Sequence, residues 1–240
     1  MNGESEDNTE RLTVKSLKLF AVFISILLWV LPAFAQINPE LLKRAENGDA
    51  QAQFDLSTMY LAGVPPNFAT AAQWLQKAAE QGHREAQFTL GWMYVEGVGV
   101  SKDEAKAAFW WQKAAEQGEP EAQCNLGAMH MGGIGVKKDD AKAIYWFEKA
   151  ASQGVSRAQY NLGSMHAMGT GTPKNFFKAA QWFKKAAEQG DAEGQLALGS
   201  LHMTGNGVSK DRQIGCNLIR ASAEQGYEKA IAIYKQFCGK

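Results

Sequence analysis

The sequence predicts an all-α protein, an α-solenoid of about five helix-turn-helix repeats with a half-repeat cap at each end. A segment of the chain recurs at a fixed interval of 36 residues, and its last residue is Gly118, Gly154, Gly190 or Gly226. Repeat periods of about 20–50 residues are typical of solenoids. Each period also holds two apolar-periodic stretches separated by glycines, which indicates two helices joined by a turn.

Five full units follow one another, and an incomplete unit lies at each end of the series. The segment 38–48 matches only the second half of a unit, and the segment 228–240 matches only the first half. A stack of repeats needs such caps because its terminal faces would otherwise expose apolar surface. The full units are residues 49–83, 84–119, 120–155, 156–191 and 192–227.

The second unit shows how each repeat is expected to fold. A first helix is predicted over about 85–95, because apolar residues recur there with helical spacing. A second helix is predicted to start near Asp103 and to end at Gly118, which has the position of a C-terminal cap. Ser101 and Glu104 have the spacing of a capping box at its start. The apolar stripe of the first helix is Ala86, Leu90, Met93 and Tyr94.

Small and large residues recur at matched positions of the units. Alanines at these positions let helices approach closely, and indoles fill the remaining space. A glycine inside each first helix costs about 1 kcal/mol in helix propensity, so we expect a neighbouring helix or a tryptophan to pack against it. The tryptophans are Trp74, Trp110, Trp146 and Trp182, and the glycines are Gly91, Gly127, Gly163 and Gly199.

The first 35 residues differ from the rest. An uncharged apolar run, Leu19 to Ala35, follows basic residues and closes on Ala33-Phe34-Ala35. This pattern predicts a signal peptide, residues 1–35, cut before Gln36 to release a single domain, 36–240. An uncleaved membrane anchor is the alternative, because 17 residues is close to the short limit for a membrane span.

The overall charge argues against one class of partner. Lys plus Arg and Asp plus Glu number 25 each. The chain therefore lacks the basic excess that marks proteins binding nucleic acid, and we expect no such partner. Any contact with a membrane is expected only through the N-terminal segment, if that segment stays uncleaved.

The second unit carries a motif that resembles the Sel1-like repeat, a relative of the tetratricopeptide helix pair. The resemblance covers essentially all of residues 38–240. It implies an α-solenoid that binds proteins on a curved surface, as exported adaptors do in envelope assembly or host contact. A cysteine-rich subset of the family implies an alternative, a β-lactam-binding or hydrolysing enzyme. The matching residues are Ala86, Leu90, Gly91, Tyr94, Gly97, Gly99, Val100, Asp103, Lys106, Ala107, Trp110, Lys113, Ala114, Ala115, Gln117 and Gly118.

The repeats contain residues that could suggest a metal site, a phosphate-binding loop or a β-lactam-hydrolysing site, and the sequence argues against each of the three. His130, His166 and His202 share one repeat position, but the spacing of successive repeats separates them by about 10 Å, so we favour a semi-buried replacement for tyrosine over a metal site. The paired glycines, such as Gly97 and Gly99, lack the context of a phosphate loop and are read as turn residues. The sequence has no S-x-x-K, S-D-N or K-T-G motif. We therefore predict a protein that is not an enzyme and has no cofactor.

Two of the three cysteines are candidates for a disulfide. Cys216 and Cys238 lie about ten residues on either side of a predicted turn near Gly226, so they reach the same height on antiparallel helices. A disulfide would close about 20 residues and stabilise the C-terminal cap by roughly 3 kcal/mol. Two unpaired thiols remain the alternative. Cys124 is expected to be a small buried residue.

Binding residues are expected on the first helices, which usually line the concave face of tetratricopeptide-like stacks. Positions that vary between units are the candidates, with simple solvation as the alternative. Trp92 and the asparagines are suited to anchor an extended peptide or a helix. One row is Asp55, Thr89, Asn125 and Asn161, and a second is Thr58, Trp92, Ala128, Ser164 and Ser200. The sequence thus predicts a periplasmic or secreted protein-binding scaffold whose partner it does not identify.

Overall fold

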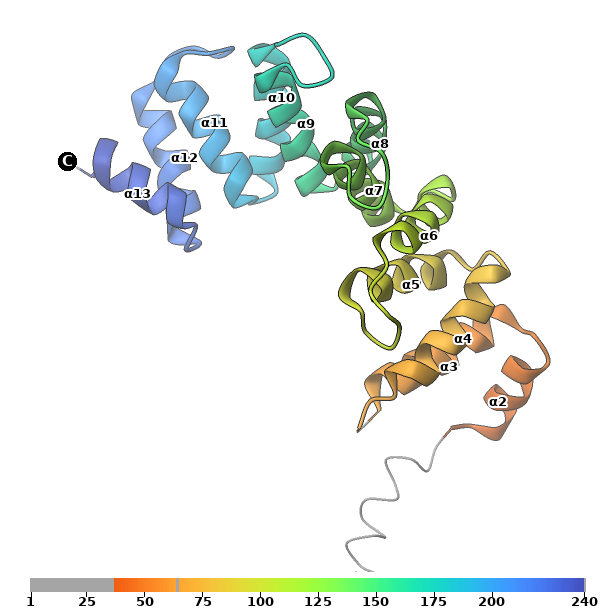
Figure 1. Cartoon of the computed structure of the whole chain (residues 1–240). Coiled ribbons are helices and arrows are strands. Elements are labelled where there is room, and N and C mark those ends of the chain that lie inside the picture. Colours follow the sequence, from red (N-terminus) through yellow and green to blue (C-terminus); the bar gives the residue numbers. More distant parts are fainter. Residues whose placement is uncertain (1–36, 64, 240) are drawn as a thin grey trace, which may run out of the picture.

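The computed structural model describes residues 37–63 and 65–239, and this part of the chain is entirely helical, with twelve helices and no strand. The helices follow one another as antiparallel pairs along a curved, elongated body, with α2 at one end and α13 at the other (Figure 1). Within the described residues, each helix contacts mainly its neighbours in the sequence. This confirms the predicted all-α solenoid. The predicted leader, 1–35, lies outside the described residues.

Each full unit contributes two helices of equal length. The N-terminal cap is α2 (Pro39–Glu46), and the C-terminal cap is α13 (Glu228–Phe237). The first helices of the units are α3 (Ala50–Ala62), α5 (Arg84–Glu96), α7 (Pro120–Gly132), α9 (Ser156–Met168) and α11 (Ala192–Thr204). The second helices are α4 (Phe68–Glu80), α6 (Glu104–Glu116), α8 (Asp140–Ser152), α10 (Phe176–Glu188) and α12 (Arg212–Glu224).

The second helix of the second unit, α6, begins at a side-chain cap that differs from the expected capping box. The N-cap of α6 is Asp103, whose carboxylate accepts a hydrogen bond from the backbone N–H of Lys106 at 2.9 Å. The predicted capping box of Ser101 and Glu104 is therefore wrong. Ser101 lies two residues before the N-cap, whereas a capping side chain must sit at the N-cap to reach the free amides of the first turn.

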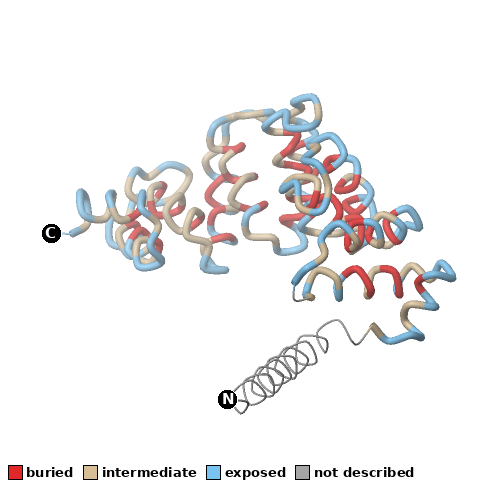
Figure 2. Tube along the Cα trace, turned by 60° about the horizontal axis from the view of Figure 1, so that its bottom comes forward, coloured by how far each residue is buried: buried red, intermediate tan, exposed pale blue. Residues whose placement is uncertain are grey.

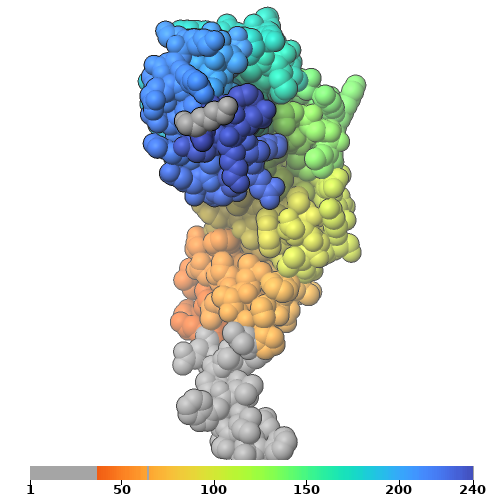
Figure 3. Space-filling view, turned by 90° about the vertical axis from the view of Figure 1, so that its left-hand side faces the viewer, coloured from red at the N-terminus to blue at the C-terminus, as the bar shows by residue number. Residues whose placement is uncertain are grey.

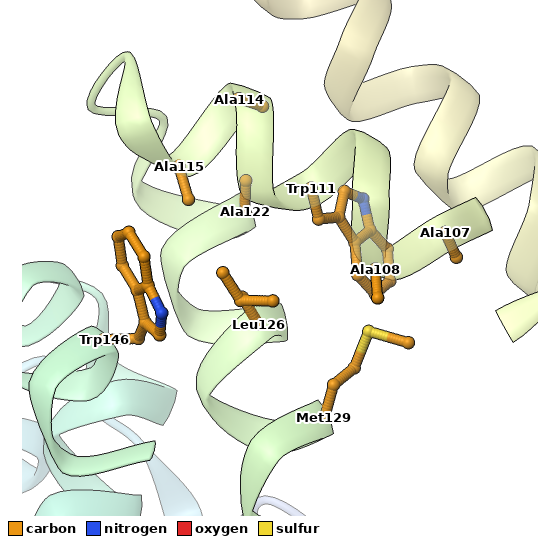
Figure 4. Packing of buried hydrophobic residues seen from close by; sticks show 9 residues of the cluster. All are labelled: Ala107, Ala108, Trp111, Ala114, Ala115, Ala122, Leu126, Met129 and Trp146. Atoms are coloured by element: carbon orange, nitrogen blue, oxygen red, sulfur yellow. The ribbon is translucent and has the colours of Figure 1, made fainter. Parts of the chain in front are cut away.

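The core lies between successive units. Trp146 of α8 lies beside Leu126 of α7, in a cluster of buried residues that includes Ala108 and Ala115 of α6, in the preceding unit (Figure 4). Trp110 and Trp146 are buried, whereas Trp74 and Trp182 are half-buried. Buried segments occur in helix after helix through the stack (Figure 2). The units follow one another in contact along the molecular surface (Figure 3). Each unit is therefore completed by its neighbour.

The helical glycines are sites of close packing, as predicted. A Cβ at Gly91 would lie 2.5 Å from the indole of Trp111, and one at Gly127 would lie 2.8 Å from the ring of Phe147. Phe183 takes this place beside Gly163, and Ile219 beside Gly199. In each of these units the contacting side chain directly follows the position at which tryptophan recurs, on the second helix. The glycine therefore lets the second helix of its own unit pack closely.

The turn glycines have two separate roles. Gly97 ends α5 in the left-handed conformation, with φ +70°, where glycine is favoured. Gly99, also at positive φ, lies against the backbone carbonyl of Phe68, the first residue of α4. The turn between the two helices thus packs on the preceding unit. This agrees with the prediction that the paired glycines are turn residues.

Within the described residues, no helix is both long and apolar enough to span a bilayer.

Candidate functional site

The exposed and half-buried side chains of α3, α5, α7, α9 and α11 form a surface that we call the first-helix face. The predicted binding residues lie on it. Trp92 is its most exposed aromatic candidate, with 44% of its surface accessible. Thr58 is exposed, and Ala128, Ser164 and Ser200 are half-buried. Trp92 is therefore a large aromatic anchor in a row whose other members, Thr58, Ala128, Ser164 and Ser200, are small.

The row of Asp55, Thr89, Asn125 and Asn161 is half-buried throughout. Asp55 accepts a hydrogen bond from the amide of Gln51 at 2.8 Å. The hydroxyl of Thr89 donates to the carbonyl of Glu85 in its own helix at 2.8 Å. Only part of this row therefore presents a polar group that is free of intrahelical bonding.

A charged row on the same face was missed by the sequence analysis. Arg157 of α9 reaches back to α7, where it donates to Asn125 Oδ1 at 2.6 Å and pairs with Glu121 at 3.2 Å. These bonds connect two units across the face. Comparing the second residue of each first helix between units would have found the row, because this position is charged in four units: Glu85, Glu121, Arg157 and Glu193.

The ends of the charged row are also engaged. Arg84 contacts Glu85 at 2.6 Å and Glu119 at 3.3 Å. Hydrogen bonding by Arg84 holds the pKa of the Glu85 carboxyl below its usual value. The hydroxyl of Tyr227 donates to Glu193 Oε1 at 3.3 Å. The acidic side chains of this row are therefore held in place by hydrogen bonds and ion pairs, which suits recognition of polar groups on a partner.

The three histidines that share one repeat position, His130, His166 and His202, lie largely between packed helices. His130 and His166 are buried, and His202 is half-buried. The Nδ1 atoms of His130 and His166 have no hydrogen-bond partner. Burial lowers the pKa of His166, and the nearby Lys178 lowers it further. In the part of the chain that the structure describes, no three His, Cys, Asp or Glu side chains gather as metal ligands.

The C-terminal cap is joined covalently to the last full unit. Cys216 of α12 and Cys238, after α13, form a disulfide with their Cα atoms 5.5 Å apart. Arg212 adds a hydrogen bond to the carbonyl of Phe237 at 2.7 Å. Cys124 is buried and free, and burial raises the pKa of its thiol.

Comparison with known proteins agrees with this arrangement. The Sel1 repeat model matches the chain five times in succession. No curated protein matches the chain. The matched segments are residues 50–83, 84–119, 120–155, 156–191 and 192–227.

Solved structures with similar folds include three bacterial proteins. A Sel1 repeat protein from Oxalobacter formigenes is 32% identical, with a TM-score of 0.74, over 82% of this chain and 78% of its own. A protective antigen of uropathogenic Escherichia coli with an SLR fold is 34% identical, with a TM-score of 0.62, over 81% of this chain and 50% of its own. A Sel1 repeat protein from Klebsiella pneumoniae is 22% identical, with a TM-score of 0.50, over 83% of this chain and 98% of its own, and shares the fold.

Five consecutive repeat matches and these structural neighbours lead to one conclusion: the chain belongs to the Sel1 repeat family.

Proposed function

We propose that this protein is a non-enzymatic scaffold that holds a partner protein on its first-helix face. Sel1 repeat proteins generally act as scaffolds for protein interaction. The observation that carries the proposal is the exposure of Trp92 on a face whose predicted binding positions otherwise carry small or polar side chains. Tryptophan and arginine are enriched among the residues that dominate binding energy at protein interfaces.

Rigidity of the face supports this role. The hydrogen bonds of Arg157 to Asn125 and Glu121 hold side chains of two units in fixed positions before any partner arrives. A pre-organised surface loses less conformational entropy on binding than a flexible one. The first-helix face is therefore suited to an extended peptide or a helix that runs across several units.

We further propose that the protein is exported and acts in the periplasm or outside the cell, in envelope assembly or host contact. Two observations support export. The segment 1–35 has the pattern of a signal peptide, and the Cys216–Cys238 disulfide suits an oxidising compartment. The intact mass of the exported protein should begin at Gln36, and a mass that includes Trp29 would contradict cleavage.

Comparative capture from native cells tests the binding face. The full chain, tagged at its C-terminus, is compared with Trp92→Ala, Asn125→Ala and the control Phe109→Ala. Phe109 is a similarly exposed aromatic residue, with 51% of its surface accessible, on the second helix α6. We expect wild type and the control to retain the same partner and Trp92→Ala to lose it.

A partner that binds all four proteins equally would show that the first-helix face is not the binding surface. Hydrolysis of a chromogenic β-lactam by the purified wild-type protein would contradict the non-enzymatic assignment.

A further inference from the structure

An apolar groove opens on the second-helix side of the stack, between α10, α11 and α12. Its volume is about 690 Å³, which falls in the range of roughly 300–1,000 Å³ that is usual for ligand sites. Its lining comes from the two second helices, from α11 and from the turn after α11. The apolar lining residues include Phe177, Ala180, Leu198, Val208, Ile214 and Leu218.

The same position two units earlier shows how such a groove is lined when the repeat tryptophan is present. Between α6, α7 and α8 the equivalent space is about 460 Å³ and is lined by Ala108, Leu126 and Val136, with Trp146 on one side. Trp146 is buried on the preceding unit. Tryptophan occupies this position in the first four units, and Leu218 replaces it in the fifth. The intervening groove, one unit earlier and beside Trp182, is about 650 Å³ and is lined mostly by charged side chains. The groove beside Leu218 is thus distinguished by its apolar lining together with the missing indole.

Two other departures from the repeat occur at the rim of the same groove. Phe177 stands where two earlier units have Ala105 and Ala141, and Ile214 stands where the second, third and fourth units have lysine. Phe177 exposes 62% of its surface and Ile214 exposes 44%. Exposed apolar side chains that cluster around a cavity mark binding sites more often than scattered ones do. Three substitutions in two units therefore converge on one apolar site.

We propose that this groove binds an aromatic side chain, preferentially tryptophan, presented by a partner polypeptide. The inserted indole would contact Leu218, which stands in the place of Trp146, and Ala180 and Leu198, the counterparts of Ala108 and Leu126 beside Trp146. Gln181 and Asn217 add amide groups that can bond to the partner's backbone, while Lys184 and Glu188 bring opposite charges to the lining. Selection at this site therefore rests on apolar shape rather than on charge.

The site is separate from the first-helix face. Phe177 lies on α10, and Ile214 and Leu218 lie on α12, both second helices. A variant at the groove thus leaves Trp92 and its neighbours unchanged, and failure of this inference would not bear on the proposed function.

Titration of the purified full chain with N-acetyl-tryptophanamide tests the inference, with N-acetyl-leucinamide as the matched ligand control. Methyl resonances are followed by two-dimensional NMR. We expect saturable shifts at Leu198, Ile214 and Leu218, with binding of the leucine compound about tenfold weaker because it buries less apolar surface. Absence of saturable shifts, or equal binding of the two compounds, would overturn the proposal.

Variants then locate the bound indole. Leu218→Trp restores the repeat residue, so its indole should occupy the part of the groove assigned to the ligand, raise Tm and abolish binding of the tryptophan compound. Trp146→Leu should open a matching site between α6 and α8. If Leu218→Trp does not fold, the rim variants Ile214→Lys and Phe177→Ala serve instead, and each should weaken binding several-fold.

Unchanged affinity in all variants that fold would show that the compound binds elsewhere and would reject the groove. If the same methyl signals shift when protein concentration alone is raised, a second copy of the chain occupies the groove, and the assignment to a partner polypeptide is wrong.

Discussion

The side-chain amide of Gln117, just after α6, donates to Oε1 of Gln87, in α5, at 2.7 Å. Gln87 is buried and also makes a second hydrogen bond. Its own amide donates to the carbonyl of Ala79, near the end of α4, at 3.0 Å. Carbonyls in the last turn of a helix lack intrahelical partners. Two glutamines thus tie the end of one unit to both helices of the next.

The bond between the two glutamines recurs in every full unit, and the second bond, to an alanine carbonyl of the preceding helix, recurs in the first four. The distance between the donor nitrogen and the acceptor oxygen is 2.7 or 2.8 Å in each pair. The donor and acceptor residues are Gln81 and Gln53, Gln117 and Gln87, Gln153 and Gln123, Gln189 and Gln159, and Gln225 and Gln195.

Replacing Gln87 by alanine should lower the free energy of unfolding by about 1–3 kcal/mol, because buried polar groups lose partners. The control is Gln76→Ala, which removes an exposed bond to Glu80 within one helix and should cost less than about 0.5 kcal/mol. Urea denaturation of both variants provides the comparison. Equal losses would show that the glutamine connection contributes nothing beyond a surface bond.

Replacing Gly127 by leucine should lower the free energy of unfolding by at least about 1–3 kcal/mol, the usual cost of overpacking. Its Cβ would lie 2.8 Å from Phe147, a fully buried ring that has no space to move. Gly132→Leu, in the same helix, is the matched control, since its nearest neighbour is the exposed side chain of Ile134. Thermal melts of the two variants should differ clearly, and an unchanged melt for Gly127→Leu would contradict the packing.

Replacing Cys216 and Cys238 together by serine should destabilise the protein by about 3 kcal/mol in the chain-entropy model. The loss should appear first in α13, which the disulfide ties to α12, as faster amide hydrogen exchange. Thiol titration of unfolded, unreduced wild type should find one thiol, that of Cys124. Three titratable thiols would show that the pair is not oxidised, and Cys124→Ser should leave none.

Lowering the pH should destabilise the protein through His166. Because the folded-state pKa is lowered by burial, the unfolded chain takes up a proton first as the pH falls below about 6.5. The free energy of unfolding therefore decreases below this pH. His166→Tyr introduces the residue found at this position in the first two units, Tyr60 and Tyr94, and removes the titrating group.

We expect the difference in Tm between pH 7.5 and pH 5.5 to be smaller in His166→Tyr than in wild type. The two Tm differences are measured by calorimetry in the same buffers. An equal difference in the two proteins would assign the pH dependence to other groups.

Much of the fold was predictable because the same pattern of apolar residues and glycines occurs in each of the five units. The matched glycines and alanines placed the helices, and α5 extends only one residue beyond the predicted range at each end. The N-caps were harder, since Ser101, Asp103 and Glu104 all suit a helix start by type. Only the backbone path shows which side chain reaches the free amides.

The first-helix face stays a prediction as a binding surface, and the structure adds contacts to it that the sequence did not indicate. Trp92 was chosen as a candidate because it differs from the small residues at the same position of the other units. The bond from Arg157 to Asn125 was missed because its partners are 32 residues apart, and their contact depends on how closely two units approach. The groove beside Leu218 was missed for a related reason, since a loss of volume is visible only among the neighbours that surround it.

The sequence alone therefore determined the helix pairs, their number and their order, because these follow from apolar periodicity and glycine placement within each unit. The tertiary structure alone decided which side chains meet across units: the glutamine pairs, the Arg157 contacts and the apolar groove between α10 and α12. The physical reason is that helix formation depends on local spacing, whereas these contacts depend on the distance and angle at which one unit packs on the next.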